Sequence, residues 1–247
     1  MTDTAQNNKR IAKNTLLLYF RMLLTMAVSL YTSRVVLSTL GVEDYGIYNV
    51  VGGVVAMFSV ISGSLSAAIS RFITYELGKG DREKLTRIFS SSVTIQLVLG
   101  LIILILAEVL GVWFLNVKMN IPESRMYAAN WVFQLSIVTF IINLISVPYN
   151  AAIIAHERMS AFAYISILEV SAKLLIVYLL LISPVDRLIF YAILMASVAL
   201  IIRFVYGYYC KRHFEECTYH FIFDAILLKR MFSFAGWNFI GSCSAIL

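Results

Sequence analysis

The sequence predicts an all-α transmembrane protein, and three observations lead to this prediction. Of its 247 residues, 60% are hydrophobic and only 14% are charged, whereas soluble domains have about 45–50% and about 25%. The mean hydropathy of +0.84 reflects the same excess. The apolar residues also form long unbroken runs, and a helix needs about 20 such residues to cross the hydrocarbon core. A soluble enzyme, a disordered chain and a membrane β-barrel are therefore excluded.

We expect six complete membrane-spanning helices and the start of a seventh. The six apolar runs are Asn14–Leu40, Gly46–Tyr75, Ile88–Leu115, Arg125–Ile154, Phe162–Ser183 and Leu188–Cys210. A seventh run begins at Ser233 and reaches the end of the sequence at Leu247, which is too short to cross the hydrocarbon. We therefore expect a six-helix lobe over residues 1–210, a cytosolic linker with an amphipathic helix over 211–232, and the start of a truncated second lobe over 233–247.

The residues in and around each run support these assignments. The first run follows a basic stretch, as a secretory signal would, but it is too long, contains Arg21 and lacks a cleavage site, so we expect it to remain as a span. The first four runs are long enough to tilt in the bilayer, and Pro148 should kink the fourth. The fifth and sixth runs have about the minimum length for a span. In the linker, Asp224 can cap a short helix that lies on the membrane surface.

The distribution of lysine and arginine predicts that the N-terminus lies in the cytosol. Basic loops stay on the cytosolic side of a membrane. This orientation places there the residues Lys9, Arg10, Lys13, Lys79, Arg82, Lys84, Arg87, Arg158, Lys211, Arg212, Lys229 and Arg230. Only Lys118, Arg125 and Arg187 would lie outside. The net charge of +6 is then explained by topology and attraction to membrane lipids, and no nucleic acid is expected as a partner.

Charged and polar side chains also occur inside the expected spans, where a charge costs about 2.5–3.5 kcal/mol at the centre. Arg21, Arg34 and Arg71 lie close enough to span ends either to reach the headgroups or to face a cavity. Glu169 and Lys173 lie one turn apart and deeper in their span than these arginines. They are expected to form either a structural ion pair or a pair that lines a cavity and couples an ion. Polar stripes follow one face of the first span (Asn14, Arg21, Thr25, Ser29, Thr32) and of the fourth (Ser136, Thr139, Asn143, Asn150). These stripes predict a hydrated interior.

Motifs for enzyme chemistry are absent from the sequence. Neither the phosphate-binding G-x-x-x-x-G-K-[ST] nor the nucleophile motif G-x-S-x-G occurs, so we expect no enzyme activity and no cofactor. One spacing, Cys210-x2-His213-x3-Cys217-x2-His220, resembles a set of metal ligands. It lies at a tyrosine-rich membrane boundary where such residues occur by chance, and we predict no metal site. Cys210 and Cys217 are expected to be free thiols on the cytosolic side.

Several segments have a familiar pattern. They are Ser33–Tyr48 with its L-G-x-x-x-Y-G turn, Ser70–Phe72, Val147–Asn150, Ala155–Met159 and Gly236–Asn238. Together they resemble the bacterial polysaccharide and O-antigen flippases. These proteins belong to the multidrug/oligosaccharidyl-lipid/polysaccharide exporter superfamily, which also contains the MATE antiporters. The resemblance covers essentially the whole chain and identifies it with the N-terminal half of such a transporter.

The resemblance implies a transporter that flips a lipid-linked oligosaccharide of the undecaprenyl-diphosphate type across the bacterial cytoplasmic (inner) membrane, for polysaccharide or lipopolysaccharide assembly. Two similar lobes would rock about a central cavity in alternating access. Arginine suits the diphosphate because its donors match phosphate oxygens. The residues expected to bind the substrate are Arg21, Arg34, Arg71, Asn143 and Asn150, and those expected to couple an ion or tune the cavity are Glu169 and Lys173. Implied partners are membrane lipids, a polysaccharide polymerase and assembly proteins.

Two alternatives stay open. A MATE-type drug or cation antiporter would have the same fold, but it would be expected to place an acidic residue deep in the first span, where this chain has arginines. A non-transporting membrane scaffold of a polysaccharide assembly complex would need neither the arginines nor the polar stripes.

Overall fold

A computed structural model describes residues 2–56, 59–183 and 186–220, together with the single positions 229, 231, 233, 236 and 237. These residues are almost entirely helical and contain no strand, which confirms the all-α prediction. The α-helices are α1 (Thr2–Ala56), α2 (Ser59–Lys79), α3 (Arg82–Leu106), α4 (Val112–Val117), α5 (Glu123–Ala155), α6 (Met159–Leu181) and α7 (Arg187–His213). A π-helical turn, Ala107–Gly111, joins α3 to α4, and a 3-10 turn, Glu215–Cys217, follows α7.

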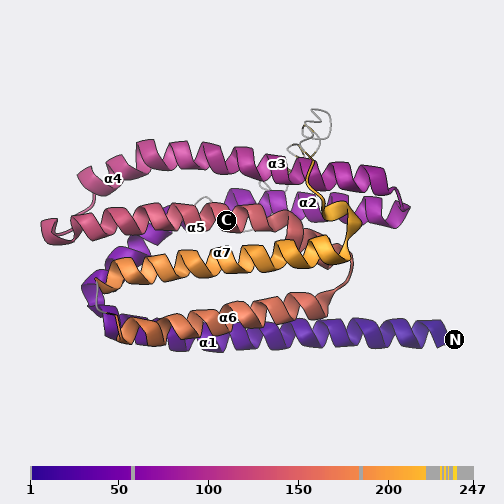
Figure 1. Cartoon of the computed structure of the whole chain (residues 1–247), viewed down its shortest axis with the longest axis horizontal. Coiled ribbons are helices and arrows are strands. Elements are labelled where there is room, and N and C mark those ends of the chain that lie inside the picture. Colours follow the sequence, from indigo (N-terminus) through magenta and orange to yellow (C-terminus); the bar gives the residue numbers. More distant parts are fainter. Residues whose placement is uncertain are drawn as a thin grey trace.

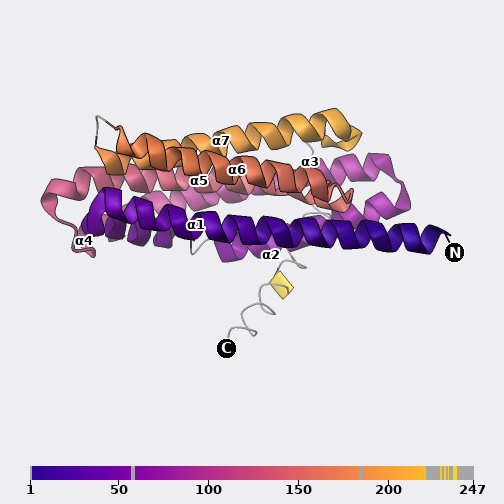
Figure 2. The ribbon, with the colours of Figure 1, turned by 90° about the horizontal axis from the view of Figure 1, so that it is seen from below.

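The long helices lie side by side in an elongated bundle (Figures 1 and 2). α5 is the central helix, because it packs against α1, α2, α3, α6 and α7. α6 packs between α1 and α7. The N-terminus, the α2–α3 connection and the end of α7 lie at one end of the bundle, which we call the N-terminal end (Figure 1). The break in α1 at Gly41 and the α4–α5 and α6–α7 connections lie at the opposite end, the Gly41 end.

The structure corrects the number of predicted spans. Among the described residues, five helices rather than six are long and apolar enough to cross a membrane, namely Asn14–Val55, Arg82–Val117, Glu123–Ala155, Met159–Leu181 and Arg187–His213. The difference arises at the second expected span, Gly46–Tyr75. Its first part continues α1 as far as Ala56, and its second part belongs to α2, whose serines and charged residues lower its hydropathy. Five such helices still make this chain a multi-pass membrane protein.

Gly41 breaks α1 and sends the chain back along the bundle (Figure 1). Its φ of 83° and ψ of 168° lie in a region that is essentially restricted to glycine. Three residues later Asp44 is buried and accepts hydrogen bonds from Arg125 near the start of α5. The same guanidinium donates to Asp186, the N-cap residue of α7, at 2.6 Å. The L-G-x-x-x-Y-G motif therefore supplies both the turn and an ion cluster that joins three helices.

Apolar side chains cover the outside of the bundle as well as its core. Phe89 and Phe133 are fully buried between helices, whereas Leu101, Ile105 and Leu168 are exposed on the outside. Such a surface would be unfavourable in water, but in a bilayer it contacts acyl chains at no cost. The helical backbone satisfies its own hydrogen bonds, as a membrane requires. The distribution of apolar residues thus agrees with a membrane-embedded bundle.

The segment after α7 folds back onto the N-terminal end of the bundle. Phe214 stacks on His156 with ring centroids 4.1 Å apart, and Glu216 pairs with the same imidazole. The backbone N–H of His220 donates to the Ser90 hydroxyl of α3 at 3.2 Å. These contacts attach the first part of the predicted linker to the ends of α3 and α5.

The predicted division into lobe, linker and second lobe remains a prediction. The expected lobe boundary at residue 210 falls inside α7, which continues to His213. The linker helix expected at Asp224 lies outside the described residues. The expected start of the second lobe at 233–247 also lies almost wholly outside them.

Candidate functional site

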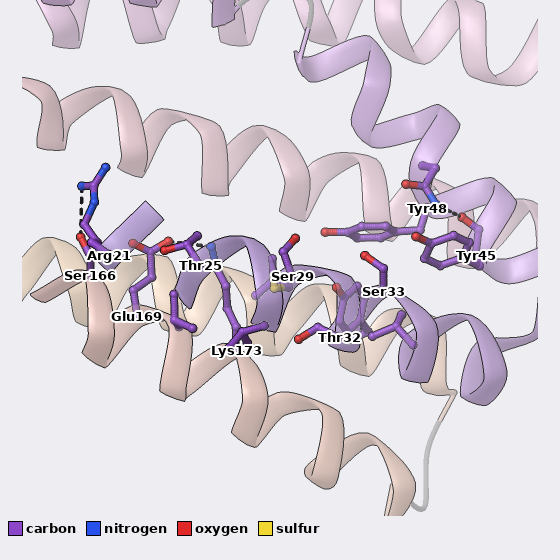
Figure 3. Close-up of a pocket in the computed structure, with 16 residues that line it drawn as sticks. Arg21, Thr25, Ser29, Thr32, Ser33, Tyr45, Tyr48, Ser166, Glu169 and Lys173 are labelled. Carbon is purple, nitrogen blue, oxygen red and sulfur yellow. Dashed lines mark hydrogen bonds and ion pairs between the residues drawn. The ribbon is translucent and has the colours of Figure 1, made fainter. Parts of the chain in front are cut away.

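A cavity of about 430 Å³ lies between α1, α6 and α7, and we call it the polar cavity. Its volume is in the range typical of ligand-binding sites. The polar side chains that line it are Arg21, Thr25, Ser29, Thr32, Ser33, Tyr45, Tyr48 and Asn49 of α1, Ser166, Glu169 and Lys173 of α6, and Tyr191 of α7. Figure 3 shows Arg21, Ser166 and Glu169 towards one end of this cavity and the tyrosines at the other.

The polar stripe of α1 brings its members into this cavity. Arg21, Thr25, Ser29 and Thr32 follow one another at three or four residues and therefore share one face of the helix. All four line the polar cavity, so the stripe forms one cavity-facing side of α1, and its hydration stays a prediction. Asn14, the first member of the predicted stripe, does not line it.

Arg21 lies at the wall of the polar cavity beside α6. Its guanidinium donates to the Ser166 hydroxyl at 3.4 Å and lies 4.3 Å from the centre of the Phe162 ring. Both contacts are with neutral groups. None of the carboxylates in the described part of the chain forms an ion pair with Arg21. The positive charge of Arg21 is therefore available to an anion that enters the cavity.

Glu169 and Lys173 form an ion pair within α6, as their spacing predicted. The Lys173 ammonium lies 2.6 Å from a Glu169 carboxylate oxygen, and the two side chains are 39% and 36% exposed. Both residues line the polar cavity. Because they belong to the same helix, the pair does not join two helices. The pair is neutral as a unit, so together with Arg21 the charged lining carries one net positive charge.

The Gly41 turn supplies the other end of the polar cavity. Tyr45, Tyr48 and Asn49 come from the part of α1 after the turn, and Tyr191 comes from α7. The rings of Tyr48 and Tyr191 meet edge to face with centroids 4.8 Å apart. None of these four residues was predicted from the sequence to be a site residue. The spacing of Tyr45, Tyr48 and Asn49, which places them on one helical face, was the signal that could have identified them.

A second cavity of about 200 Å³ lies between α1, α5 and α7, and it shares Tyr48 and Met195 with the polar cavity. The fourth-span stripe residues Ser136, Thr139 and Asn143 line it. The structure therefore places Asn143 in a cavity that adjoins the polar cavity at Tyr48.

Three of the predicted substrate-binding residues line neither of these two cavities. Arg34 and Arg71 are exposed on α1 and α2. Asn150 is half-buried in α5, and its side-chain oxygen has no hydrogen-bond partner among the described residues. Arg34 follows Ser33 directly, so it points about 100° away from the cavity-lining face of α1. The structure thus brings together Arg21, Glu169 and Lys173, and not the three arginines.

The spacing that resembles a metal site does not produce one in the described residues, which contain no group of three or more potential metal ligands. Cys210 and Cys217 are free and buried, as free thiols were predicted. A hydrogen bond with Cys210, together with burial, raises the pKa of the Cys217 thiol above its ordinary value. His213 instead stacks on Tyr209 with ring centroids 4.2 Å apart.

The chemistry of the polar cavity suits a ligand that is both anionic and rich in hydroxyl groups. Arg21 can bind an oxyanion through several N–H donors. Hydroxyl and amide side chains can replace the water that a polar group loses on entering the membrane.

Comparisons with known proteins agree with a membrane protein of this kind. Residues 11–247 match the model of a family described as "Polysaccharide biosynthesis protein". Over 159 residues the chain is 26% identical to the "Uncharacterized membrane protein EpsK" of Bacillus subtilis (strain 168). This match covers 64% of the chain and 31% of the length of that relative. No solved structure matches the chain at a significant level.

The family match extends over nearly all of the sequence, and it includes α1 from Ile11 onwards and all of α2 to α7. It therefore covers both the Gly41 turn and the residues of the polar cavity. The chain belongs to the polysaccharide biosynthesis protein family of membrane proteins.

Proposed function

We propose that this chain forms part of a transporter that flips a lipid-linked oligosaccharide of the undecaprenyl-diphosphate type across the bacterial cytoplasmic membrane. In this proposal the N-terminal end of the bundle faces the cytosol. The protein is a transporter and not an enzyme, and it supplies sugar units for polysaccharide or lipopolysaccharide assembly. The proposal goes beyond the family assignment, which concerns polysaccharide biosynthesis as a whole.

One observation carries the proposal: Arg21, which has no carboxylate partner among the described residues, lines a hydroxyl-rich cavity in a bundle with an apolar exterior. A diphosphate and a glycan cannot cross hydrocarbon unaided, because their polar groups would lose their hydrogen bonds to water. Arg21 can balance the anion, and the serine, threonine and asparagine side chains of the cavity can satisfy sugar hydroxyls. The polyprenyl chain can remain outside the bundle, in contact with lipid.

The ion pair of α6 gives the cavity a second cation that an anion could recruit. Lys173 is paired with Glu169 in the structure. If the substrate diphosphate binds Lys173, the Glu169 carboxylate loses its partner and becomes a site for a proton or a metal cation. Binding of the anion and uptake of a coupling cation would then be linked at this pair.

The drug or cation antiporter is a weaker candidate on the same geometry. Its cargo would meet a net positive charge in the polar cavity, because the Glu169 carboxylate is already paired with Lys173. The proposed polymerase and assembly-protein partners of the transporter follow from its role in polysaccharide assembly.

The test replaces Arg21 by alanine in the whole transporter. Cells that depend on this transporter are assayed for lipid-linked oligosaccharide at the outer leaflet with a membrane-impermeant lectin. Loss of a hydrogen-bonded charge partner costs about 1.5–3 kcal/mol, so delivery should fall by roughly 10- to 150-fold. Arg87→Ala is the matched control, because Arg87 is an exposed arginine of α3 that pairs with Glu83.

Equal delivery by the Arg21→Ala and Arg87→Ala variants would refute the role of Arg21 in binding the anion. Arg34→Ala and Arg71→Ala in the same assay test the roles that the family resemblance implies for these residues. If the whole protein delivers no lipid-linked sugar and its loss only disperses other assembly proteins, it is a scaffold and the proposed function is wrong.

A further inference from the structure

The polar cavity has two ends of different chemistry. At one end are the charged side chains of Arg21, Glu169 and Lys173 (Figure 3). At the other, around Tyr45 and Tyr48, no charged side chain lines the cavity among the described residues. We call this second region, formed by Thr32, Ser33, Tyr45, Tyr48, Asn49 and Tyr191, the aromatic end.

We infer that the aromatic end is a sugar-binding subsite, which holds a pyranose ring while the charged end holds the diphosphate of the same molecule. This inference rests on the proposed function and adds to it the position and orientation of the glycan. The glycan points from Arg21 towards the Gly41 end of the bundle.

The aromatic rings provide the first element of such a subsite. One face of a pyranose presents C–H groups, which pack against the face of an aromatic ring, while a tyrosine also offers a hydroxyl for hydrogen bonding. Tyr45 and Tyr48 are half-buried and Tyr191 is buried. The edge-to-face contact of Tyr48 and Tyr191, with centroids 4.8 Å apart, fixes the Tyr48 ring at the cavity wall. A fixed ring loses little conformational entropy when a sugar binds.

Polar groups around the rings provide the second element. The Thr32 hydroxyl oxygen is buried at the cavity wall and has no hydrogen-bond partner among the described residues. A buried hydroxyl without a partner is unfavourable, so a sugar hydroxyl that it meets after rotation of the Thr32 side chain would stabilise it. The Asn49 amide nitrogen donates to the Tyr45 carbonyl at 2.8 Å, which leaves the amide oxygen as an acceptor. The Ser33 hydroxyl adds a donor and an acceptor.

The distance between the two ends fits one elongated ligand. Arg21 and Ser33 are twelve residues apart on α1, which corresponds to about 18 Å along the helix. This span leaves room for a diphosphate at one end and for sugar units between it and the tyrosines. The second cavity continues beyond Tyr48, where Ser136, Thr139 and Asn143 can receive a further sugar unit.

The test compares two probes on the 247-residue chain in lipid nanodiscs. One probe is farnesyl diphosphate, and the other is farnesyl diphosphate linked to a trisaccharide of hexoses. The wild-type chain should bind the glycosylated probe about tenfold more tightly, as one or two additional contacts of this kind provide. Tyr48→Ala and Asn49→Ala should each remove most of this difference and leave the affinity for farnesyl diphosphate unchanged. Arg21→Ala should lower the affinity for both probes by the same factor.

Controls separate a subsite from a structural role. Tyr48→Phe keeps the ring and should retain most of the preference for the glycosylated probe. Tyr164→Ala removes a tyrosine of α6 that is 73% exposed and lies outside the cavity, and it should change neither affinity. Unchanged binding of farnesyl diphosphate by the Tyr48, Asn49 and Tyr164 variants demonstrates that these variants are folded.

Two outcomes would overturn the inference, and they differ in what they say about the proposed function. If the wild-type chain binds both probes with equal affinity, or if Tyr48→Ala lowers the affinity for both probes by the same factor, the aromatic end is not a sugar subsite. The proposed anion site at Arg21 is not contradicted by either result. If the wild-type chain binds neither probe, the subsite and the proposed function fail together.

Discussion

Replacing Arg125 by alanine should destabilise the bundle, because it leaves a buried carboxylate without its partner. Asp44 is 6% exposed and accepts two hydrogen bonds from the Arg125 guanidinium, one of them at 2.7 Å. Removing one member of a buried pair costs about 3–5 kcal/mol. The Arg125 side chain is 28% exposed, so solvent screening reduces this cost, and we expect about 2–3 kcal/mol.

The assay is thermal unfolding of the chain in detergent, followed by tryptophan fluorescence. For a chain of this length, about 2–3 kcal/mol corresponds to a decrease in Tm of roughly 5–10 °C. Arg187→Ala is the matched control, because Arg187 is an exposed arginine at the same end and, among the described residues, its guanidinium donates to the Thr39 carbonyl at 3.2 Å and pairs with no carboxylate. Its Tm should change by no more than the small amount usual for a surface substitution.

A double substitution tests the physical reason for the loss. When Asp44→Asn is combined with Arg125→Ala, no buried charge remains, so the double variant should be more stable than Arg125→Ala alone. If Arg125→Ala unfolds at the same temperature as Arg187→Ala, the ion cluster contributes nothing to stability. If the double variant loses the sum of the two single losses, the penalty does not come from an unpaired Asp44.

Two further predictions concern packing and thiol chemistry. A Cβ atom at Gly111 would lie 2.3 Å from Phe133 Cζ, so Gly111→Ala should lower the free energy of unfolding by about 1–3 kcal/mol. Adding Phe133→Leu should restore most of this stability, and a double variant that recovers none of it would contradict the packing explanation. Because the pKa of Cys217 is raised in the folded chain, iodoacetamide at about pH 8.5 should label it slowly until the chain is denatured, as mass spectrometry of its peptide can measure. The raised pKa also means that the free energy of unfolding should fall as the pH rises above the ordinary thiol pKa of 9.0. Rapid labelling of Cys217 in the folded chain would contradict the raised pKa.

The positions of most helices could be predicted from hydropathy. The expected run Arg125–Ile154 corresponds to α5, Glu123–Ala155, within a few residues at each end. The same holds for Phe162–Ser183 and α6. The predicted turn between Leu40 and Gly46 agrees with the break at Gly41. The second run, Gly46–Tyr75, differs because it is divided between the end of α1 and α2, and the serines and charged residues of α2 lower its hydropathy.

The candidate site was predicted only in part, because periodicity places residues on a face without saying what that face contacts. The stripe of Arg21 and Thr25 on α1, and the pair of Glu169 and Lys173 on α6, follow from spacing within single helices. That both faces line the same cavity depends on how α1 packs against α6. Arg34 has the same chemistry as Arg21, and only its angular position on α1 separates it from the cavity.

By itself, the sequence determined that this protein lies in a lipid bilayer, that it is helical, and the family to which it belongs. Composition and unbroken apolar runs are sufficient for the first two, because only helices and closed barrels satisfy backbone hydrogen bonds in lipid. The tertiary structure alone decided which polar residues meet. Arg21, Lys173 and Tyr191 are separated by more than a hundred and fifty residues from first to last, and they line one cavity only because α1, α6 and α7 pack together around it.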